Sequence, residues 1–177
     1  MYKRQGPIVS VLGATAVSDL NAAFPEASVL RTMPNVGVEI AQGVICHAPP
    51  GDAAALAPAL EMLGRIATLY ELPEDQLDAA TTVMGCSPAW LTVATEATAT
   101  AAAGAGLDPE LAKQLIARTT AVTGELLLRH EAAEIRRIVA SPGGSTEAGL
   151  DELDAEHAAA AYEAAVRAAL ERMEGKR

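Results

Sequence analysis

Alanine is the residue that most constrains this chain, because 39 of its 177 residues are alanine while only 3% are aromatic. Alanine has the highest helix propensity, and its small side chain lets helices approach one another closely. Half of the residues are hydrophobic, which is enough apolar surface for a substantial core. We therefore expect most of the chain to form helices that pack tightly against other helices.

The charge of the chain argues against nucleic-acid binding. The formal net charge is −10, whereas a surface that follows phosphates needs clustered Lys and Arg, and bases stack on aromatic rings. No apolar run approaches the roughly 20 residues that a membrane-spanning helix needs, and no signal-peptide pattern opens the chain. The sequence predicts a cytoplasmic protein that binds neither nucleic acid nor membrane.

The cysteines and histidines predict neither a disulfide framework nor a metal site. Cys46 and Cys86 lack the CxxC spacing of metal ligands, and we interpret them as small core residues in a reducing compartment. His47, His130 and His157 are far apart and have no partner at i, i+4. We expect no bound metal.

The first fifty residues have the pattern of a parallel α/β sheet. Apolar runs at residues 8–12, 28–30 and 43–46 predict three buried strands, and Ser18 with Asp19 offers an N-cap for a short helix between the first two. This order favours parallel pairing. Three strands and one short helix cannot cover both faces of such a sheet. We therefore interpret residues 1–50 as the remnant of a larger α/β domain.

The first five residues, MYKRQ, carry no strand or cap pattern. They resemble the translated end of a sequencing-library adapter. We interpret residues 1–5 as a non-native scar and expect the open reading frame to begin within a domain.

From residue 51 onward the pattern is helical, and we expect residues 51–177 to form a separate domain. Asp52 is a candidate N-cap, and Pro73 can open a long helix. That helix meets Gly-Cys-Ser-Pro at residues 85–88, which we expect to kink or break it. Asp108 followed by proline is the expected start of a further helix.

Four blocks of the sequence occur in an order that one enzyme family shares. Residues 132–154 read AAEIRRIVASPGGSTEAGLDELD, around a Ser-Pro-Gly-Gly turn followed by threonine. Residues 30–35 read LRTMPN, which matches the pattern R-x-M-P-N, and residues 78–90 read DAATTVMGCSPAW, which matches D-A-V-T-A-L-S-G-S-G-P-A-Y. The smaller matches are Val9, Ser10, Gly106, Leu107 and Gly124. Together these blocks resemble the pyrroline-5-carboxylate reductases, and we identify the chain as a member of that family.

The resemblance implies a fold and an activity. The fold is mostly α: an all-helical dimerisation domain, preceded by the tail of a parallel α/β (Rossmann) domain. The activity is the reduction of 1-pyrroline-5-carboxylate to L-proline with NADPH or NADH, the last step of proline biosynthesis. Partners are the imino acid and a second copy of the chain in a homodimer, with higher oligomers left open.

The dinucleotide fingerprint G-x-G-x-x-G is absent from the sequence. We therefore expect the main cofactor motif to lie in a missing N-terminal half, and the chain by itself to be inactive.

The resemblance places the substrate at the turn of residues 141–146. The residues it implies are Ser141, Gly143, Gly144, Ser145 and Thr146, and the Thr146 hydroxyl would bond the ring nitrogen as proton donor. Independently, two glycines let the backbone approach a ligand, and a helix that begins after them favours an anion such as a carboxylate. Taken alone, the turn is explained better by an ordinary N-cap and a tight turn.

The resemblance also places Met33, Pro34 and Asn35 beside the nicotinamide. Taken alone, these residues are a loop whose proline fixes the strand exit. The reaction requires little from side chains, because the nicotinamide supplies the reductant and the protein positions the reacting carbons.

Two departures from the family pattern leave the substrate open. Residues 84–90 read MGCSPAW where the family has S-G-S-G-P-A-Y, and Glu131 with Ala132 replaces the usual His-Pro. One alternative is a related NAD(P)-dependent reductase that acts on another imine or a small oxo acid. The other is a non-enzymatic helical dimerisation module that has lost its cofactor domain.

Overall fold

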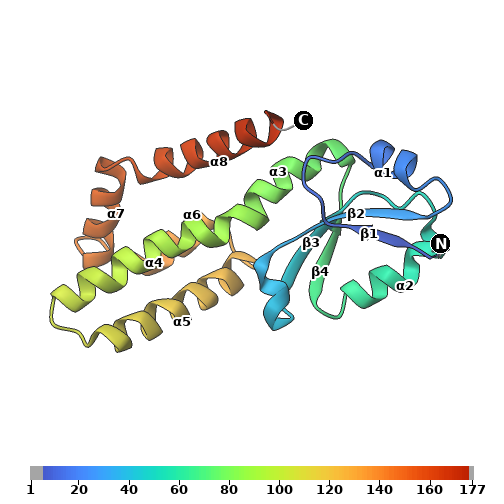
Figure 1. The fold of residues 1–177 in the computed structure, drawn as a ribbon. Coiled ribbons are helices and arrows are strands. Elements are labelled where there is room, and N and C mark those ends of the chain that lie inside the picture. The colour runs from blue at the N-terminus through green and yellow to red at the C-terminus, as the bar shows by residue number, and fades with distance from the viewer. Residues whose placement is uncertain (1–5, 176–177) are drawn as a thin grey trace. The chain divides into compact units, whose positions relative to one another are not determined.

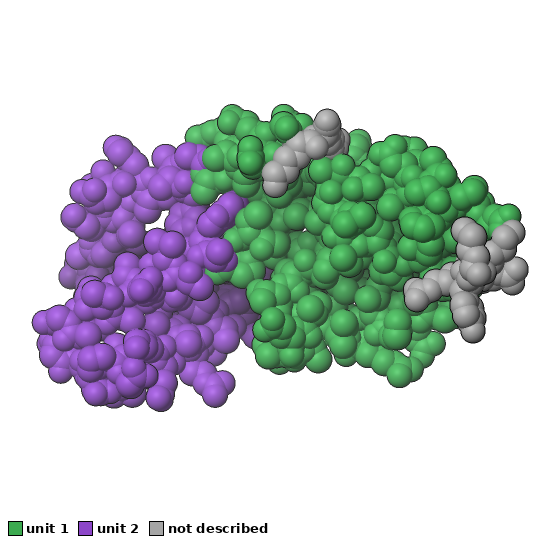
Figure 2. All heavy atoms as spheres, viewed as in Figure 1, with its two compact units in different colours: residues 1–88, 165–177 green, residues 89–164 purple. Residues whose placement is uncertain are grey.

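The computed structural model describes residues 6–175, so the proposed scar at residues 1–5 lies outside the described residues. The chain divides into two compact units, and each is described by itself (Figure 2). The first consists of Met1–Pro88 with Ala165–Arg177, and the second of Ala89–Ala164.

The first unit contains a four-stranded sheet with the strand order β1-β2-β3-β4 (Figure 1). The strands are β1 (Ile8–Ser10), β2 (Val29–Pro34), β3 (Gly43–His47) and β4 (Ala67–Glu71). β1 pairs with β2, and β3 with β4, in parallel, but β2 and β3 are antiparallel. The predicted parallel pairing is confirmed for β1 with β2 but was wrong for β2 with β3. Residues 35–42 are too few for the crossover that parallel strands require.

Two helices accompany the sheet, α1 (Val17–Ala23) and α2 (Ala53–Leu63). The predicted cap of α2 is confirmed, because the Asp52 carboxylate accepts a hydrogen bond from the backbone N–H of Ala55 at 3.0 Å. The predicted cap of α1 was wrong. Ser18 and Asp19 lie inside the helix, which begins at Val17.

A continuous helical stretch follows the sheet. It begins with the 3-10 turn Glu74–Gln76 and α3 (Leu77–Thr81), passes through a π-helical turn at Thr82–Cys86, and continues as α4 (Ser87–Gly104). The disturbance predicted at residues 85–88 is therefore a π-turn rather than a break, which is a common way for a helix to absorb an irregularity.

The remaining helices are α5 (Pro109–Leu127), α6 (Ala132–Val139), α7 (Ser145–Ala155) and α8 (Ala158–Glu174). The predicted start of α5 is confirmed, because the Asp108 carboxylate accepts from the backbone N–H of Leu111 at 2.9 Å. A sheet followed by a mostly helical remainder agrees with the predicted fold class.

The core of the first unit lies between the sheet and α3. Cys46, Ala48 and Leu77 form a buried cluster, against which Met84 packs with other partly buried side chains. Burial raises the pKa of the Cys46 thiol, as expected for a small core residue. Cys86 is partly buried in the π-turn.

The sheet unit continues well past residue 50. Both α2 and β4 follow that position, and β4 pairs with β3 over five residues. The assignment of the two portions to a Rossmann remnant and a dimerisation domain stays a prediction.

In the part of the chain that the structure describes, no helix is long and apolar enough to cross a membrane. Residues 6–175 also contain no group of three or more His, Cys, Asp or Glu side chains that could hold a metal ion.

Gly37 tests how tightly the connection between β2 and β3 is packed. A Cβ at Gly37 would lie 2.7 Å from the Gln42 carbonyl oxygen and 3.1 Å from the Gly43 Cα, so the backbone would have to move. We expect Gly37→Ala to lower the free energy of unfolding by about 1–3 kcal/mol. Urea unfolding measures this. Gly51→Ala is the control, because nothing lies within 4 Å of its added Cβ, and an equal loss in both variants would contradict the explanation.

Candidate active site

The predicted substrate site is a tight turn between α6 and α7. Pro142 follows Ser141, Gly143 has a φ of +72°, and the backbone N–H of Gly144 donates to the Ser141 carbonyl at 2.9 Å. Proline at the second position with a positive φ at the third is typical of a type II turn, which favours glycine at that third position. Gly143 is thus required by its backbone conformation.

Gly144 is required for a different reason. A Cβ there would lie 2.6 Å from the Ser141 Oγ and 2.9 Å from the Ser141 carbonyl oxygen. The chain passes so close to itself that this position has no room for a side chain. The two consecutive glycines therefore have separate structural causes.

The start of α7 is open at its amides. Gly144 is the N-cap residue, and no side chain caps the helix there. The simpler explanation, in which Ser145 or Thr146 is an ordinary N-cap, therefore does not hold. Within residues 6–175, the partly buried Thr146 hydroxyl has no hydrogen-bond partner. The Glu147 carboxylate accepts from the backbone N–H of Gly143 at 2.7 Å, so this end of the helix already attracts a carboxylate.

Met33 and Pro34 are the last residues of β2, and Asn35 caps the following 3-10 helix, Val36–Ile40. Pro34 is opposite Ile45 in the antiparallel pair. The neighbouring Asn35 points its N–H at the Val44 carbonyl at 3.1 Å. N–H directions alternate along a strand, so the nitrogen of Pro34 faces away from β3 and toward the side of β1. The last residue of β1, Ser10, pairs with Arg31, so β1 does not extend as far as Pro34. Proline therefore costs this sheet no hydrogen bond.

The predicted residues fall into two groups. Met33, Pro34 and Asn35 belong to the first unit, and residues 141–146 belong to the second. The structure gives the geometry of each group by itself.

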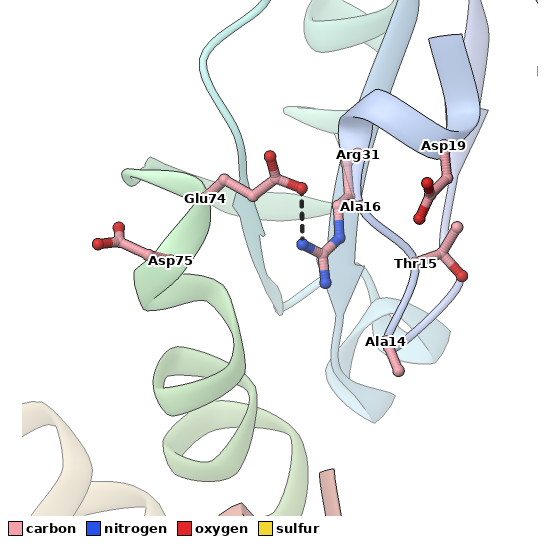
Figure 3. A pocket seen from close by; sticks show the side chains of 7 residues that line it. All are labelled: Ala14, Thr15, Ala16, Asp19, Arg31, Glu74 and Asp75. Carbon is pink, nitrogen blue, oxygen red and sulfur yellow. Dashed lines mark hydrogen bonds and ion pairs between the residues drawn. The ribbon is translucent and has the colours of Figure 1, made fainter. Parts of the chain in front are cut away.

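A pocket in the first unit was not predicted from the sequence. Its volume is about 680 Å³ (Figure 3). The lining residues are Ala14, Thr15, Ala16, Asp19, Arg31, Glu74 and Asp75. In the close view the Arg31 guanidinium lies between Glu74 and the loop that carries Thr15.

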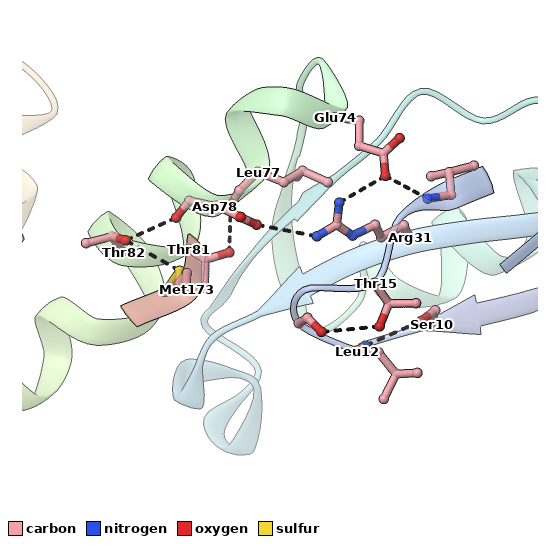
Figure 4. A network of polar contacts seen from close by, with 12 residues as sticks. Ser10, Leu12, Thr15, Arg31, Glu74, Leu77, Asp78, Thr81, Thr82 and Met173 are labelled. Atoms are coloured by element: carbon pink, nitrogen blue, oxygen red, sulfur yellow. Dashed lines mark hydrogen bonds and ion pairs between the residues drawn. The ribbon is translucent and has the colours of Figure 1, made fainter. Parts of the chain in front are cut away.

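Arg31 is almost completely buried, with 1% of its surface exposed. Its Nη1 contacts Glu74 Oε1 at 3.0 Å and its Nη2 contacts Asp78 Oδ1 at 3.4 Å (Figure 4). Two carboxylates compensate the charge of this guanidinium, while its Nε is buried and has no hydrogen-bond partner among the described residues. The partners are 43 and 47 residues away in the sequence, and no local pattern could have identified them.

A family model described as "Pyrroline-5-carboxylate reductase dimerisation" matches residues 74–176. The chain belongs to this family. The match confirms the resemblance predicted from the sequence blocks. It begins at Glu74, so it includes both acceptors of Arg31, while Arg31 itself precedes it.

Curated relatives of this family member bear the name pyrroline-5-carboxylate reductase. The protein from Thermus thermophilus is 35% identical over 167 residues, which are 93% of this chain and 64% of that protein. Pyrroline-5-carboxylate reductase 2 from Bacillus subtilis is 36% identical over 157 residues, which are 84% of this chain and 55% of that protein. The chain thus spans less than two thirds of the length of either relative.

Solved structures show the same fold as this family member. A pyrroline carboxylate reductase from Plasmodium falciparum, solved with NADP bound, superposes with a TM-score of 0.85 at 23% identity. The match covers 94% of this chain and 68% of that chain. A 1-pyrroline-5-carboxylate reductase from Streptococcus pyogenes gives a TM-score of 0.87 at 23% identity, over 96% of this chain and 67% of that chain.

Removal of the Glu74 carboxylate tests the Arg31 ion pairs. Glu74→Ala leaves a buried guanidinium with one acceptor fewer and also removes the acceptor of the Val17 N–H. Breaking a fully buried pair costs about 3–5 kcal/mol. The Glu74 side chain is 37% exposed, so we expect a loss of about 2 kcal/mol in the free energy of unfolding.

The matched control is Asp75→Ala. It also removes one carboxylate, but Asp75 is the next residue in the chain and its side chain is exposed. Urea unfolding of both variants measures the difference. Equal stability of the two variants would show that the Arg31 contacts contribute nothing specific.

Proposed function

We propose that this chain contributes the substrate-binding helices and part of the dinucleotide-binding sheet of an oxidoreductase of proline biosynthesis, which reduces 1-pyrroline-5-carboxylate to L-proline. The observation that carries the proposal is the open N-terminus of α7 directly after the Ser-Pro-Gly-Gly turn, within the residues that match the family. The names of the curated relatives support the same reaction.

The substrate carboxylate binds at the start of α7 in this proposal. The unpaired backbone amides of a helix N-terminus and its positive dipole favour a small anion, and no side-chain cap occupies them here. Ser141, Gly143, Gly144 and Ser145 shape this position, and the two glycines leave no side chain in the way.

Thr146 supplies the proton. When a hydride adds to the carbon of the C=N bond, the nitrogen gains an electron pair and must take up a proton. The Thr146 hydroxyl is partly buried beside the proposed carboxylate position and has no partner in the described chain. It is therefore free to donate to the ring nitrogen, as a general acid does.

A nicotinamide dinucleotide, NADPH or NADH, supplies the hydride. We place its nicotinamide near Met33, Pro34 and Asn35. These residues fit, because they lie at the carboxyl end of β2, which is parallel to β1, and open α/β sheets bind dinucleotides at the carboxyl ends of their parallel strands. The NADP in the Plasmodium structure supports the cofactor class.

We place the border between the two portions after β4. The sheet, through residue 71, is the Rossmann portion, and the helices from residue 74 are the dimerisation and substrate-binding portion. Pairing of β4 with β3 and the start of the family match at residue 74 support this border. We also place the protein in the cytoplasm, where the two free cysteines stay reduced.

The second unit supports a homodimer, with a higher oligomer left open. Its buried hydrophobic residues are only alanines, Ala99 and Ala112. Many large apolar side chains of this unit are exposed instead. They are Leu91, Val93, Leu107, Leu111, Leu115, Val122, Leu126, Leu127, Leu128, Ile138, Val139, Leu153 and Tyr162. An apolar surface of this extent marks an interaction site, and the family match supports a second copy of the chain as its partner.

Replacement of Thr146 tests the reaction. We expect Thr146→Val, which removes the hydroxyl at nearly constant volume, to lower kcat by about 100-fold or more, because general acids contribute about that much. Thr146→Ser keeps the hydroxyl and should keep most of the activity. NADPH oxidation with 1-pyrroline-5-carboxylate, assayed on the complete gene product, measures both.

No turnover by the wild-type protein would overturn the proposed substrate, and a panel of other cyclic imines and small oxo acids would then identify the alternative. Wild-type kcat in Thr146→Val would remove the proton-donor role while leaving the reaction in place.

The dimer is tested on α5. Leu115 and Val122 are seven residues apart on one face of the helix, and they are 52% and 59% exposed. We expect Leu115→Glu with Val122→Glu to convert the dimer to a monomer, because two charges would be buried in an apolar interface. Size-exclusion chromatography with light scattering measures the mass. Gln114→Glu adds charge at an exposed polar position and should remain dimeric, and a monomeric wild type would contradict the proposal.

A further inference from the structure

Pro88 deprives one helical carbonyl of its normal partner. In an α-helix the carbonyl of Met84 would accept from the N–H four residues later, but that residue is Pro88, which has no N–H and whose ring would clash with the same carbonyl. The chain accommodates the proline by the π-turn Thr82–Cys86 immediately before α4. The Met84 carbonyl is therefore without the donor that a regular α-helix would give it.

Asn35 supplies this donor. Its side-chain Nδ2 donates to the Met84 carbonyl at 3.2 Å, across a separation of 49 residues. Both residues belong to the first unit and are partly buried. The hydrogen bond connects the exit of β2 to the π-turn.

The other end of the carboxamide is held just as firmly. Asn35 Oδ1 accepts from the backbone N–H groups of Gly37 at 3.1 Å and Val44 at 2.9 Å. The backbone carbonyl of Asn35 accepts a hydrogen bond from the backbone N–H of Val38 at 3.3 Å, at the point where the main chain leaves the sheet. The side-chain oxygen thus takes the place of the backbone carbonyl opposite Val44. A carboxamide turned the other way would put its NH₂ group against two donors, so its orientation is fixed.

We propose that Asn35 is a positioning residue of the reductase site: its carboxamide holds the strand exit at Met33 and Pro34 and the π-turn around Met84 in one fixed geometry, by donating to the carbonyl that Pro88 deprives of its α-helical donor. The proposal rests on the proposed function only in placing the nicotinamide beside this strand exit. Asn35 acts through the backbone of both segments, since its three side-chain hydrogen bonds are made within the chain.

Asn35→Asp tests the donor selectively. Aspartate has nearly the same shape and keeps the acceptor for Gly37 and Val44, but it places a carboxylate oxygen against the Met84 carbonyl. We expect the KM for NADPH to rise and kcat to fall, each about threefold or more, so that kcat/KM falls about tenfold, or about 1.4 kcal/mol. The KM for 1-pyrroline-5-carboxylate should stay within about twofold, because the proposed carboxylate site lies on α7.

Pro88→Ala provides the rescue. Alanine restores an N–H that can donate to the Met84 carbonyl, so the harm of Asn35→Asp should be much smaller when it is combined with Pro88→Ala. A double-mutant cycle on the urea unfolding midpoint measures this coupling. Trp90, the single tryptophan of the chain, lies two residues after Pro88 and reports the local geometry through its emission maximum. We expect the emission to shift in Asn35→Asp and to return in the double variant.

The matched control is Asn21→Asp, the same chemical change at an exposed position of α1, which should leave the midpoint and the emission unchanged. An additive cycle would overturn the proposal, because Asn35 would then not act through the Met84 carbonyl. A non-additive cycle with an unchanged KM for NADPH would reduce Asn35 to a structural residue and overturn the positioning role. The double-mutant cycle and the Trp90 emission can be measured without enzyme activity. Absence of turnover in the wild type would therefore count against the proposed function alone and would leave the test of Asn35 in place.

Discussion

The buried guanidinium of Arg31 is the interaction on which the first unit depends. A charge with 1% exposure is tolerated only when it is paired, and its partners Glu74 and Asp78 come from the start of the helical stretch. Glu74 also accepts from the Val17 N–H at 2.7 Å and so begins α1. One ion-pair network thereby fixes β2, α1 and α3 relative to one another and connects the sheet to the residues that match the family.

The features that could be predicted from the sequence are those with local causes. Asp52 and Asp108 cap helices whose first turns follow them directly, and Pro88 disturbs the helix that contains it. What could not be predicted depends on residues distant in the sequence. The cap of α1 comes from Glu74, 57 residues away, and Asn35, which donates to the Met84 carbonyl, is 49 residues away from it. Contacts between residues so far apart leave no periodicity or fixed spacing in the sequence from which they could be predicted.

The candidate site shows the same division. Resemblance to a family identified the turn at residues 141–146 and the residues at the exit of β2. The backbone freedom of glycine explained why a turn could form there. The structure adds that Gly143 and Gly144 are needed for separate reasons, one conformational and one steric. It also adds that the side chain of Asn35 is committed to the backbone, which its place in a loop motif could not reveal.

The contact between Glu147 and the Gly143 N–H changes the energetics of any anion that arrives at α7. Because that N–H already has a carboxylate acceptor from its own helix, an arriving anion that uses it exchanges one charge-assisted hydrogen bond for another instead of gaining a new one. The displaced side chain must then be hydrated again. An anion that binds through this N–H therefore replaces the Glu147 carboxylate. Its affinity reflects the difference between the free energies of the two interactions and not the strength of either one alone.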